Sequence, residues 1–189
     1  KPWPPGSSFY GYDAMLDAGL RNVRNQGVLM RGVNDTPEQL LDLCFALQDE
    51  AMITPYYFYM CDMIPFSEHW RLSLREAQEL QHAIMGYLPG FATPRIVCDV
   101  PFVGKRWVHQ VESYDRDKGM SFWRKHYRTS IEAGDEQALS REYVYYDPIY
   151  TLSQLGQDWW RKNTDMDALH AAAFEEAGAS RHASVRIHA

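Results

Sequence analysis

The segment ITPYYFYMCD, residues 53–62, is rich in β-branched and aromatic residues, which are typical of a strand, and it ends in a Cys–Asp pair. A second segment, RIVCD at residues 95–99, repeats this ending, and Asp99 lies 37 residues after Asp62. That spacing is about the length of one strand–helix unit. Parallel neighbouring strands would place both carboxylates on one rim, at the carboxyl ends, where α/β proteins have their active sites.

Helix and strand signals alternate around these two segments. Residues 11–20 are typical of the end of a helix, and residues 27–30 form an apolar run expected of a buried strand. Capping boxes at Thr36 and Ser73 predict two further helices, the second with one apolar face made of Ala77, Leu80, Ile84 and Tyr87. This alternation over residues 11–99 predicts an α/β fold, with the helices outside a parallel sheet.

The two ends of the chain have a different composition. Residues 1–10 are rich in Pro, Gly and Ser and are expected to form an extended lead-in. Residues 106–189 carry scattered tryptophans and tyrosines with poor periodicity, apart from a helix predicted at 165–178. We interpret this half as a C-terminal extension that packs on residues 11–105 or on a partner.

Composition excludes several classes of function. The net charge of −6 and the pI of about 5.6 argue against a general nucleic-acid binder. No apolar run approaches the roughly 20 residues of a membrane span, so no membrane partner is expected. The three cysteines, Cys44, Cys61 and Cys98, are too widely spaced for a zinc or iron–sulfur site built from this chain alone. A reducing, cytoplasmic setting is the expectation.

Lys105 is the third chemical group predicted near the rim, because it stands six residues after Asp99, just beyond Gly104. An amine beside two carboxylates can form an imine with an aldehyde such as pyridoxal phosphate, bind a phosphate, or neutralise the acids. The structural alternative is a solvated surface lysine with two turn-forming aspartates. Composition and spacing alone lead only to an α/β protein with an acidic, lysine-bearing rim.

Three motifs carry a resemblance to a known family: NQGVLMRGVNDTPEQL at 25–40, PYYFYMCD at 55–62 and IVCDVPFVGK at 96–105. In this order and spacing, residues 11–105 resemble the C-terminal part of lysine 2,3-aminomutases. These are radical S-adenosylmethionine enzymes with a [4Fe-4S] cluster and pyridoxal phosphate. The resemblance implies that the chain forms the last βα units of a partial barrel. It also implies a reaction that moves the α-amino group of a basic amino acid to the β-carbon, with lysine favoured and arginine as the alternative.

The resemblance also assigns roles to individual residues. Lys105 stands at the position of the lysine that holds pyridoxal phosphate. Asp62 and Asp99 match the two acids that bind the side-chain ammonium of the substrate. Gln26 matches a glutamine on the S-adenosylmethionine side, and Tyr59 matches a tyrosine near the cofactors.

The sequence departs from the family pattern at three places. The loop before Lys105 reads PFVGK instead of a run of glycines, and Phe102 and Val103 restrict the approach of the backbone to a phosphate. The family's structural zinc is not expected, because Thr36 and Pro37 occupy one ligand region and no cysteine follows Cys98. The CxxxCxxC motif that binds the cluster is absent, so the cluster ligands are not in this chain.

These departures leave several hypotheses open. In the first group of hypotheses, the chain is either a fragment of a complete aminomutase, or pairs with the missing N-terminal half, or forms a homo-oligomer through the aromatic extension. Two other classes are a non-catalytic interaction module that keeps the end of the barrel and a pyridoxal-phosphate protein without radical chemistry.

Overall fold

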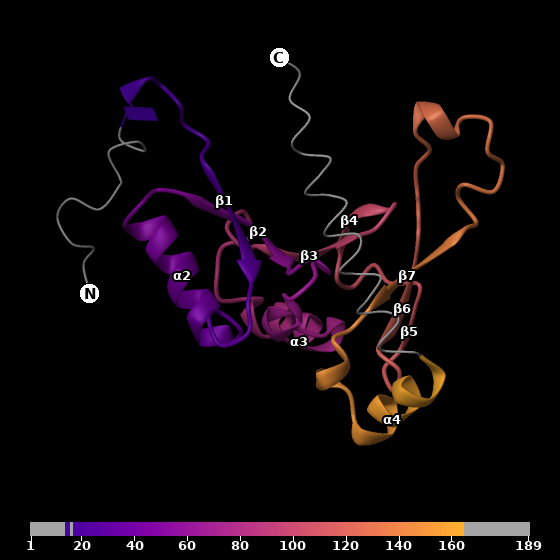
Figure 1. Ribbon diagram of the computed structural model, residues 1–189. Helices are drawn as coiled ribbons and strands as arrows, with labels where there is room; N and C mark the ends of the chain where they lie inside the picture. Colours follow the sequence, from indigo (N-terminus) through magenta and orange to yellow (C-terminus); the bar gives the residue numbers. More distant parts are fainter. Residues whose placement is uncertain (1–13, 16, 165–189) are drawn as a thin grey trace, which may run out of the picture.

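The computed structural model of the 189-residue chain describes residues 14–15 and 17–164. A four-stranded main sheet organises the first part of the fold, with strand order β1-β2-β3-β4 (Figure 1). The first three strands run parallel to one another, as predicted, and β4 is antiparallel to β3. Their bounds are β1 Arg24–Leu29, β2 Thr54–Met60, β3 Arg95–Val100 and β4 Gly104–Trp107.

Two helices connect the parallel strands and cover the same face of the main sheet (Figure 1). Helix α2 (Pro37–Asp49) begins at Thr36 and helix α3 (Leu74–Ile84) begins at Ser73, and both capping boxes are formed as predicted. The apolar face predicted for the second helix is wrong at its last member. The backbone leaves the helical conformation at Met85, which is extended. Tyr87 therefore lies beyond the end of α3 and is 66% exposed.

The hydrophobic core lies between these helices and one face of the main sheet. Alternate strand residues point into it, as the two-residue period of a strand requires. The helices contribute Leu40, Cys44, Leu74, Ala77, Leu80 and Ile84, and the strands contribute Leu29, Phe58, Met60, Ile96, Cys98 and Val100. The intervening residues of β1 and β2, including Gln26 and Tyr59, are exposed or half-buried on the opposite face. The core therefore fixes which strand side chains remain available for a site.

The β3–β4 hairpin was not predicted from the sequence. Residues 100–104 were expected to form only a loop before Lys105. Residues 101–103 make the turn, and the Val103 N–H donates to the Val100 carbonyl at 3.0 Å. Gly104, which pairs with Val100 in the ladder, has a φ of +81°, a conformation that glycine adopts without strain. The hairpin places Lys105 in a strand, directly opposite Asp99.

A second, antiparallel sheet follows the hairpin, with strand order β5-β6-β7. It packs on the first part of the chain, because Trp123 and Tyr145 belong to the same core cluster as α3 and β3. The predicted helix at 165–178 lies outside the described residues. The remaining elements are β5 Ser113–Asp115, β6 Met120–Arg124, β7 Glu142–Tyr146, α4 Gln154–Asn163 and the short 3₁₀ helices η1 Glu68–Trp70, η2 Ser130–Glu132 and η3 Ile149–Thr151.

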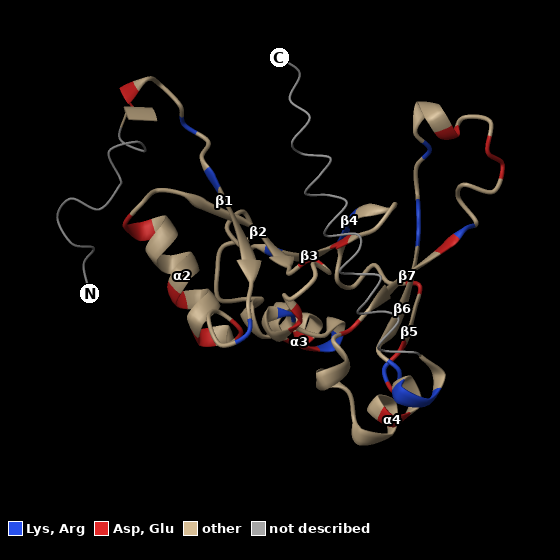
Figure 2. Ribbon diagram, viewed as in Figure 1, with Lys and Arg blue, Asp and Glu red and all other residues tan. Residues whose placement is uncertain are grey.

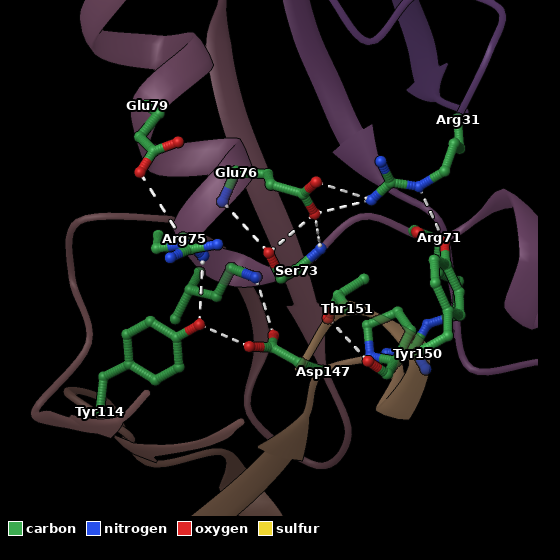
Figure 3. A network of polar contacts seen from close by, with 12 residues as sticks. Arg31, Arg71, Ser73, Arg75, Glu76, Glu79, Tyr114, Asp147, Tyr150 and Thr151 are labelled. Atoms are coloured by element: carbon green, nitrogen blue, oxygen red, sulfur yellow. Dashed lines mark hydrogen bonds and ion pairs between the residues drawn. The ribbon is translucent and has the colours of Figure 1, made fainter. Parts of the chain in front are cut away.

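A buried polar junction joins the start of α3 to the second sheet (Figure 3). Asp147, which follows β7 and is 5% exposed, accepts hydrogen bonds from the Leu74 N–H at 2.7 Å and from the Tyr114 hydroxyl at 2.5 Å. Burial raises the pKa of Asp147, and these hydrogen bonds offset the effect only in part. The junction ties the second sheet to the N-terminus of α3.

A second set of contacts in Figure 3 holds the same end of α3 against the main sheet. Arg31, which follows β1, donates to both carboxylate oxygens of Glu76 at 2.7 and 2.8 Å. Burial alone would raise the pKa of Glu76, but the hydrogen bonds from Arg31 and Ser73 outweigh it and lower the pKa. The start of α3 is therefore fixed from both sides.

These observations confirm a mixed α/β fold with parallel strands covered by helices, and they add an antiparallel strand and sheet. In the described part of the chain, no helix has the length and apolar character of a membrane span. Acidic residues line the solvent side of α2, where Glu38, Asp42 and Asp49 are exposed (Figure 2).

Candidate functional site

Four of the five predicted site residues form a chain of contacts across the open face of the main sheet. The Tyr59 hydroxyl donates to Gln26 Oε1 at 3.4 Å, which links β2 to β1. The Lys105 amine lies 5.4 Å from the centre of the Tyr59 ring and 3.5 Å from Asp99 Oδ2. The parallel strands and the hairpin therefore bring together Gln26, Tyr59, Asp99 and Lys105.

Strand register explains why these side chains meet. Tyr59 and Asp99 are the next-to-last residues of β2 and β3, so both lie near the carboxyl ends of neighbouring parallel strands. Asp99 and Lys105 are direct partners across the antiparallel β3–β4 ladder. Directly opposite residues of such a pair project their side chains from the same face. The hairpin thus delivers an amine to the edge where the parallel strands end.

Asp62 occupies a different environment. It stands two residues beyond the end of β2, so it lies near the predicted rim, but its side chain is exposed. The backbone carbonyl of Asp62 accepts hydrogen bonds from the Ile64 N–H at 2.9 Å and from the Ser67 hydroxyl at 3.3 Å. The contacts that join the other four residues do not include Asp62.

The Lys105–Asp99 ion pair is loosely held. The two side chains are 53% and 40% exposed, and the distance of 3.5 Å is long for a charge-assisted hydrogen bond. Exposed pairs of this kind contribute about 0–1 kcal/mol to stability. The amine is therefore accessible and can leave Asp99 at little cost, which a reactive or ligand-binding lysine requires.

The residues present fit the aldehyde end of pyridoxal phosphate. An accessible primary amine is the group that condenses with this aldehyde, and Asp99 stands beside it to balance a positive charge. Among the described residues there is no group of three or more His, Cys, Asp or Glu side chains that could hold a metal ion. The described residues therefore offer no ligand set for an iron–sulfur cluster.

Sequence reasoning missed the residues that support the turn before Lys105 from β7 and from the connection that precedes it. The Tyr127 hydroxyl donates to the Val103 carbonyl at 3.1 Å, and the Tyr143 ring stacks on Phe102 with centroids 6.4 Å apart. Both tyrosines come from a region without clear periodicity. The sequence offered no signal beyond the general abundance of aromatic residues.

A cavity of about 280 Å³ lies at the junction between α3 and the second sheet. Asp147 and Tyr114 line it, and both are engaged in the buried hydrogen bonds described above. Arg75 and Arg116 add positive charge at its edge, and Asp117 adds negative charge. We assign this cavity to the junction between α3 and the second sheet, because Asp147 and Tyr114 already have partners there.

Asp99 lies near the carboxyl end of a parallel strand, and the antiparallel strand β4 brings the Lys105 amine beside it. This edge of a parallel sheet is where α/β proteins have their active sites. The chain is 37% identical over 89 residues to the L-lysine 2,3-aminomutase of Methanococcus maripaludis, which is 47% of this chain and 20% of the relative. It is 34% identical over 87 residues to that of Clostridium subterminale, covering 46% and 20%. It is 34% identical over 92 residues to that of Buchnera aphidicola, covering 49% and 26%.

These matches confirm the resemblance predicted from the motifs. Over about half of its length the chain is related to the lysine 2,3-aminomutase family, which is a family of isomerases. The matched segment spans only about a fifth to a quarter of the length of these relatives. No family model matches the chain.

Proposed function

We propose that this chain forms the substrate end of a 2,3-aminomutase that moves the α-amino group of a basic amino acid to the β-carbon. The Lys105 amine beside Asp99, at the carboxyl ends of parallel strands, is the observation that carries the proposal. The similarity to lysine 2,3-aminomutases supports the reaction class.

The proposed roles follow from the positions of the side chains. Lys105 would hold pyridoxal phosphate through its amine, and Asp99 would keep the charge of this amine balanced whenever it is free. The Tyr59 ring lies against the amine and limits the directions from which it can be approached. Gln26 holds the Tyr59 hydroxyl and would face S-adenosylmethionine. Bound pyridoxal phosphate supplies the carbonyl that carries the migrating amino group.

The substrate class rests on the acids of the rim. Asp62 is exposed, whereas Asp99 already faces the Lys105 amine. Asp62 is therefore the better placed of the two acids to accept a substrate cation. An ammonium or a guanidinium would each satisfy a carboxylate, and a guanidinium adds a two-pronged geometry. Lysine is the favoured substrate because the relatives carry that name, and arginine is the alternative.

The test uses the full-length gene product, purified without oxygen and supplied with pyridoxal phosphate, S-adenosylmethionine and a strong reductant. Lysine and arginine are offered separately, and the β-amino products are separated by chromatography. We expect a β-amino acid from one basic substrate and none after Lys105→Met. In the active protein, Asp62→Asn should raise the KM by at least about tenfold, because one charge-assisted contact contributes roughly 1.5–3 kcal/mol.

Each possible result bears on the proposal. An Asp62→Asn variant with the wild-type KM would remove Asp62 from substrate binding. Pyridoxal phosphate bound at Lys105 with no conversion of either amino acid would favour a pyridoxal-phosphate protein without radical chemistry. Neither cofactor binding nor conversion would leave the chain as a non-catalytic module of the same fold.

A further inference from the structure

The turn that leads into Lys105 contains a strained residue. Phe102 has a φ of +64°, in the left-handed region that glycine and asparagine tolerate and that bulky residues rarely adopt. Pro101 precedes it, and the Val103 N–H closes the turn on the Val100 carbonyl at 3.0 Å. Backbone strain of this kind persists only where the surrounding structure enforces it. We therefore looked for the contacts that hold Phe102 in this conformation.

Tyr127 provides the main restraint on the turn. Its hydroxyl donates to the Val103 carbonyl at 3.1 Å, and the Val103 side chain is fully buried. The stacking of Phe102 on Tyr143 is a weaker contact, because the centroids are 6.4 Å apart and Phe102 remains 84% exposed. The hydrogen bond and the burial of Val103 thus hold the turn more firmly than the aromatic stack.

Tyr127 also contacts the residue that follows Lys105. The Arg106 guanidinium carbon lies 5.5 Å from the centre of the Tyr127 ring, within the range of a cation–π contact. Arg106 Nε and Nη2 are buried, and within the described part of the chain they have no hydrogen-bond partner. One tyrosine therefore contacts the chain on both sides of Lys105, at Val103 and at Arg106.

The segment that carries Tyr127 is itself held in place. Lys125, which is 8% exposed, forms an ion pair with Glu132 at 2.5 Å. The hydrogen bond from Lys125, together with those from Thr129, lowers the pKa of Glu132 to about 2, so the pair stays charged at ordinary pH. The Lys125 amine also lies 5.7 Å from the Tyr143 ring centre. The two aromatic contacts of the hairpin thus come from the connection that follows β6, which carries Tyr127, and from β7, which carries Tyr143.

We propose that Tyr127 is a positioning residue that fixes the β3–β4 turn and thereby holds Lys105 beside Asp99 and Tyr59. This inference rests on the proposed function, in which Lys105 holds pyridoxal phosphate. It assigns the β6–β7 connection to the same site as the parallel strands. The PFVGK turn, with its bulky residues, is stable in this shape because Tyr127 of this connection supports it.

The first readout is the stability of the turn, measured by hydrogen exchange, and it needs no cofactor. Tyr127→Phe in the full-length protein removes the hydroxyl and keeps the ring over Arg106, and Tyr87→Phe removes a hydroxyl from an exposed tyrosine elsewhere. Hydrogen exchange followed by mass spectrometry would report on residues 100–107. We expect exchange there to quicken about tenfold in Tyr127→Phe, as the loss of one hydrogen bond implies, and to stay unchanged in Tyr87→Phe. Unchanged exchange in Tyr127→Phe would overturn the proposal.

The second readout is the reactivity of Lys105 itself. Pyridoxal phosphate is added over a range of pH, trapped on amines with borohydride and located by peptide mass spectrometry. In Tyr127→Phe we expect at least about threefold less label on Lys105 and a shifted pH profile, with other lysines labelled as before. Faster exchange with wild-type labelling would make Tyr127 a structural brace only and reject the positioning role. No label on Lys105 in the wild type would instead reject the proposed function, whatever the exchange shows.

Discussion

Two carboxylates of this chain, Asp99 and Asp147, end up in opposite environments. Asp99 faces Lys105 at 3.5 Å on an open sheet face, and both side chains are about half exposed. Asp147 is 5% exposed and is held by Leu74 and Tyr114 at 2.7 and 2.5 Å. The difference shows how the fold divides its polar groups. Short buried contacts join the second sheet to α3, and a long exposed contact leaves an amine available for chemistry.

The comparison implies that removing the buried acid should have the largest effect on stability. Asp147→Ala takes the acceptor from the Leu74 N–H at the start of α3 and leaves the Tyr114 hydroxyl without its partner. Two buried donors without partners should lower the free energy of unfolding by about 3 kcal/mol. Urea denaturation followed by circular dichroism measures this loss.

The matched control is Asp147→Asn, which keeps an oxygen that can accept from the Leu74 N–H. It should cost about 1 kcal/mol. If Asp147→Ala lost less than about 1 kcal/mol, the junction would not be what holds the second sheet to α3, and the contrast with Asp99 would fail.

A smaller effect is expected from pH, and its sign follows from the raised pKa of Asp147. The folded protein holds this proton more tightly than the unfolded chain, whose pKa is near the ordinary value of 3.8. The stability that the protonated acid contributes is complete below that value, and it is lost as the pH rises through the higher folded pKa. Glu76, with its lowered pKa, acts in the opposite direction and loses its contribution as the pH falls.

Urea denaturation of the wild type and of Asp147→Asn, between about pH 4 and pH 7, separates the two groups, because Glu76 is common to both. The wild type should lose stability relative to the variant as the pH rises. A constant difference across this range would mean that Asp147 titrates alike in the folded and unfolded states.

The sequence predicted the parallel strands and their helices because local signals specify them. Thr36 and Ser73 form capping boxes that depend on residues three positions away, and the apolar periods of α2 and β2 lie within single elements. The same reasoning failed at Tyr87, where the helix ends earlier than the apolar pattern does.

The site was predicted only in part, and the missing part is non-local. Gln26, Tyr59, Asp99 and Lys105 lie in one chain of contacts, which Asp62 does not join. Strand β4 was missed because a phenylalanine at positive φ is not a recognisable turn signal. The contact from Tyr127 spans 24 residues and joins the β6–β7 connection to the β3–β4 turn. No local pattern encodes such a contact, so it becomes visible only once the second sheet is in place.

The smallest effect on stability should come from the site itself. Asp99→Asn removes the charge opposite Lys105 but keeps an oxygen within reach of the amine, and both side chains remain open to water. The free energy of unfolding should therefore change by less than about 0.5 kcal/mol. The same urea denaturation used for Asp147 measures it, so the two acids are compared directly. A loss above about 1.5 kcal/mol would mean that Asp99 is committed to the fold in the way Asp147 is, and the amine of Lys105 would then not be free to leave it.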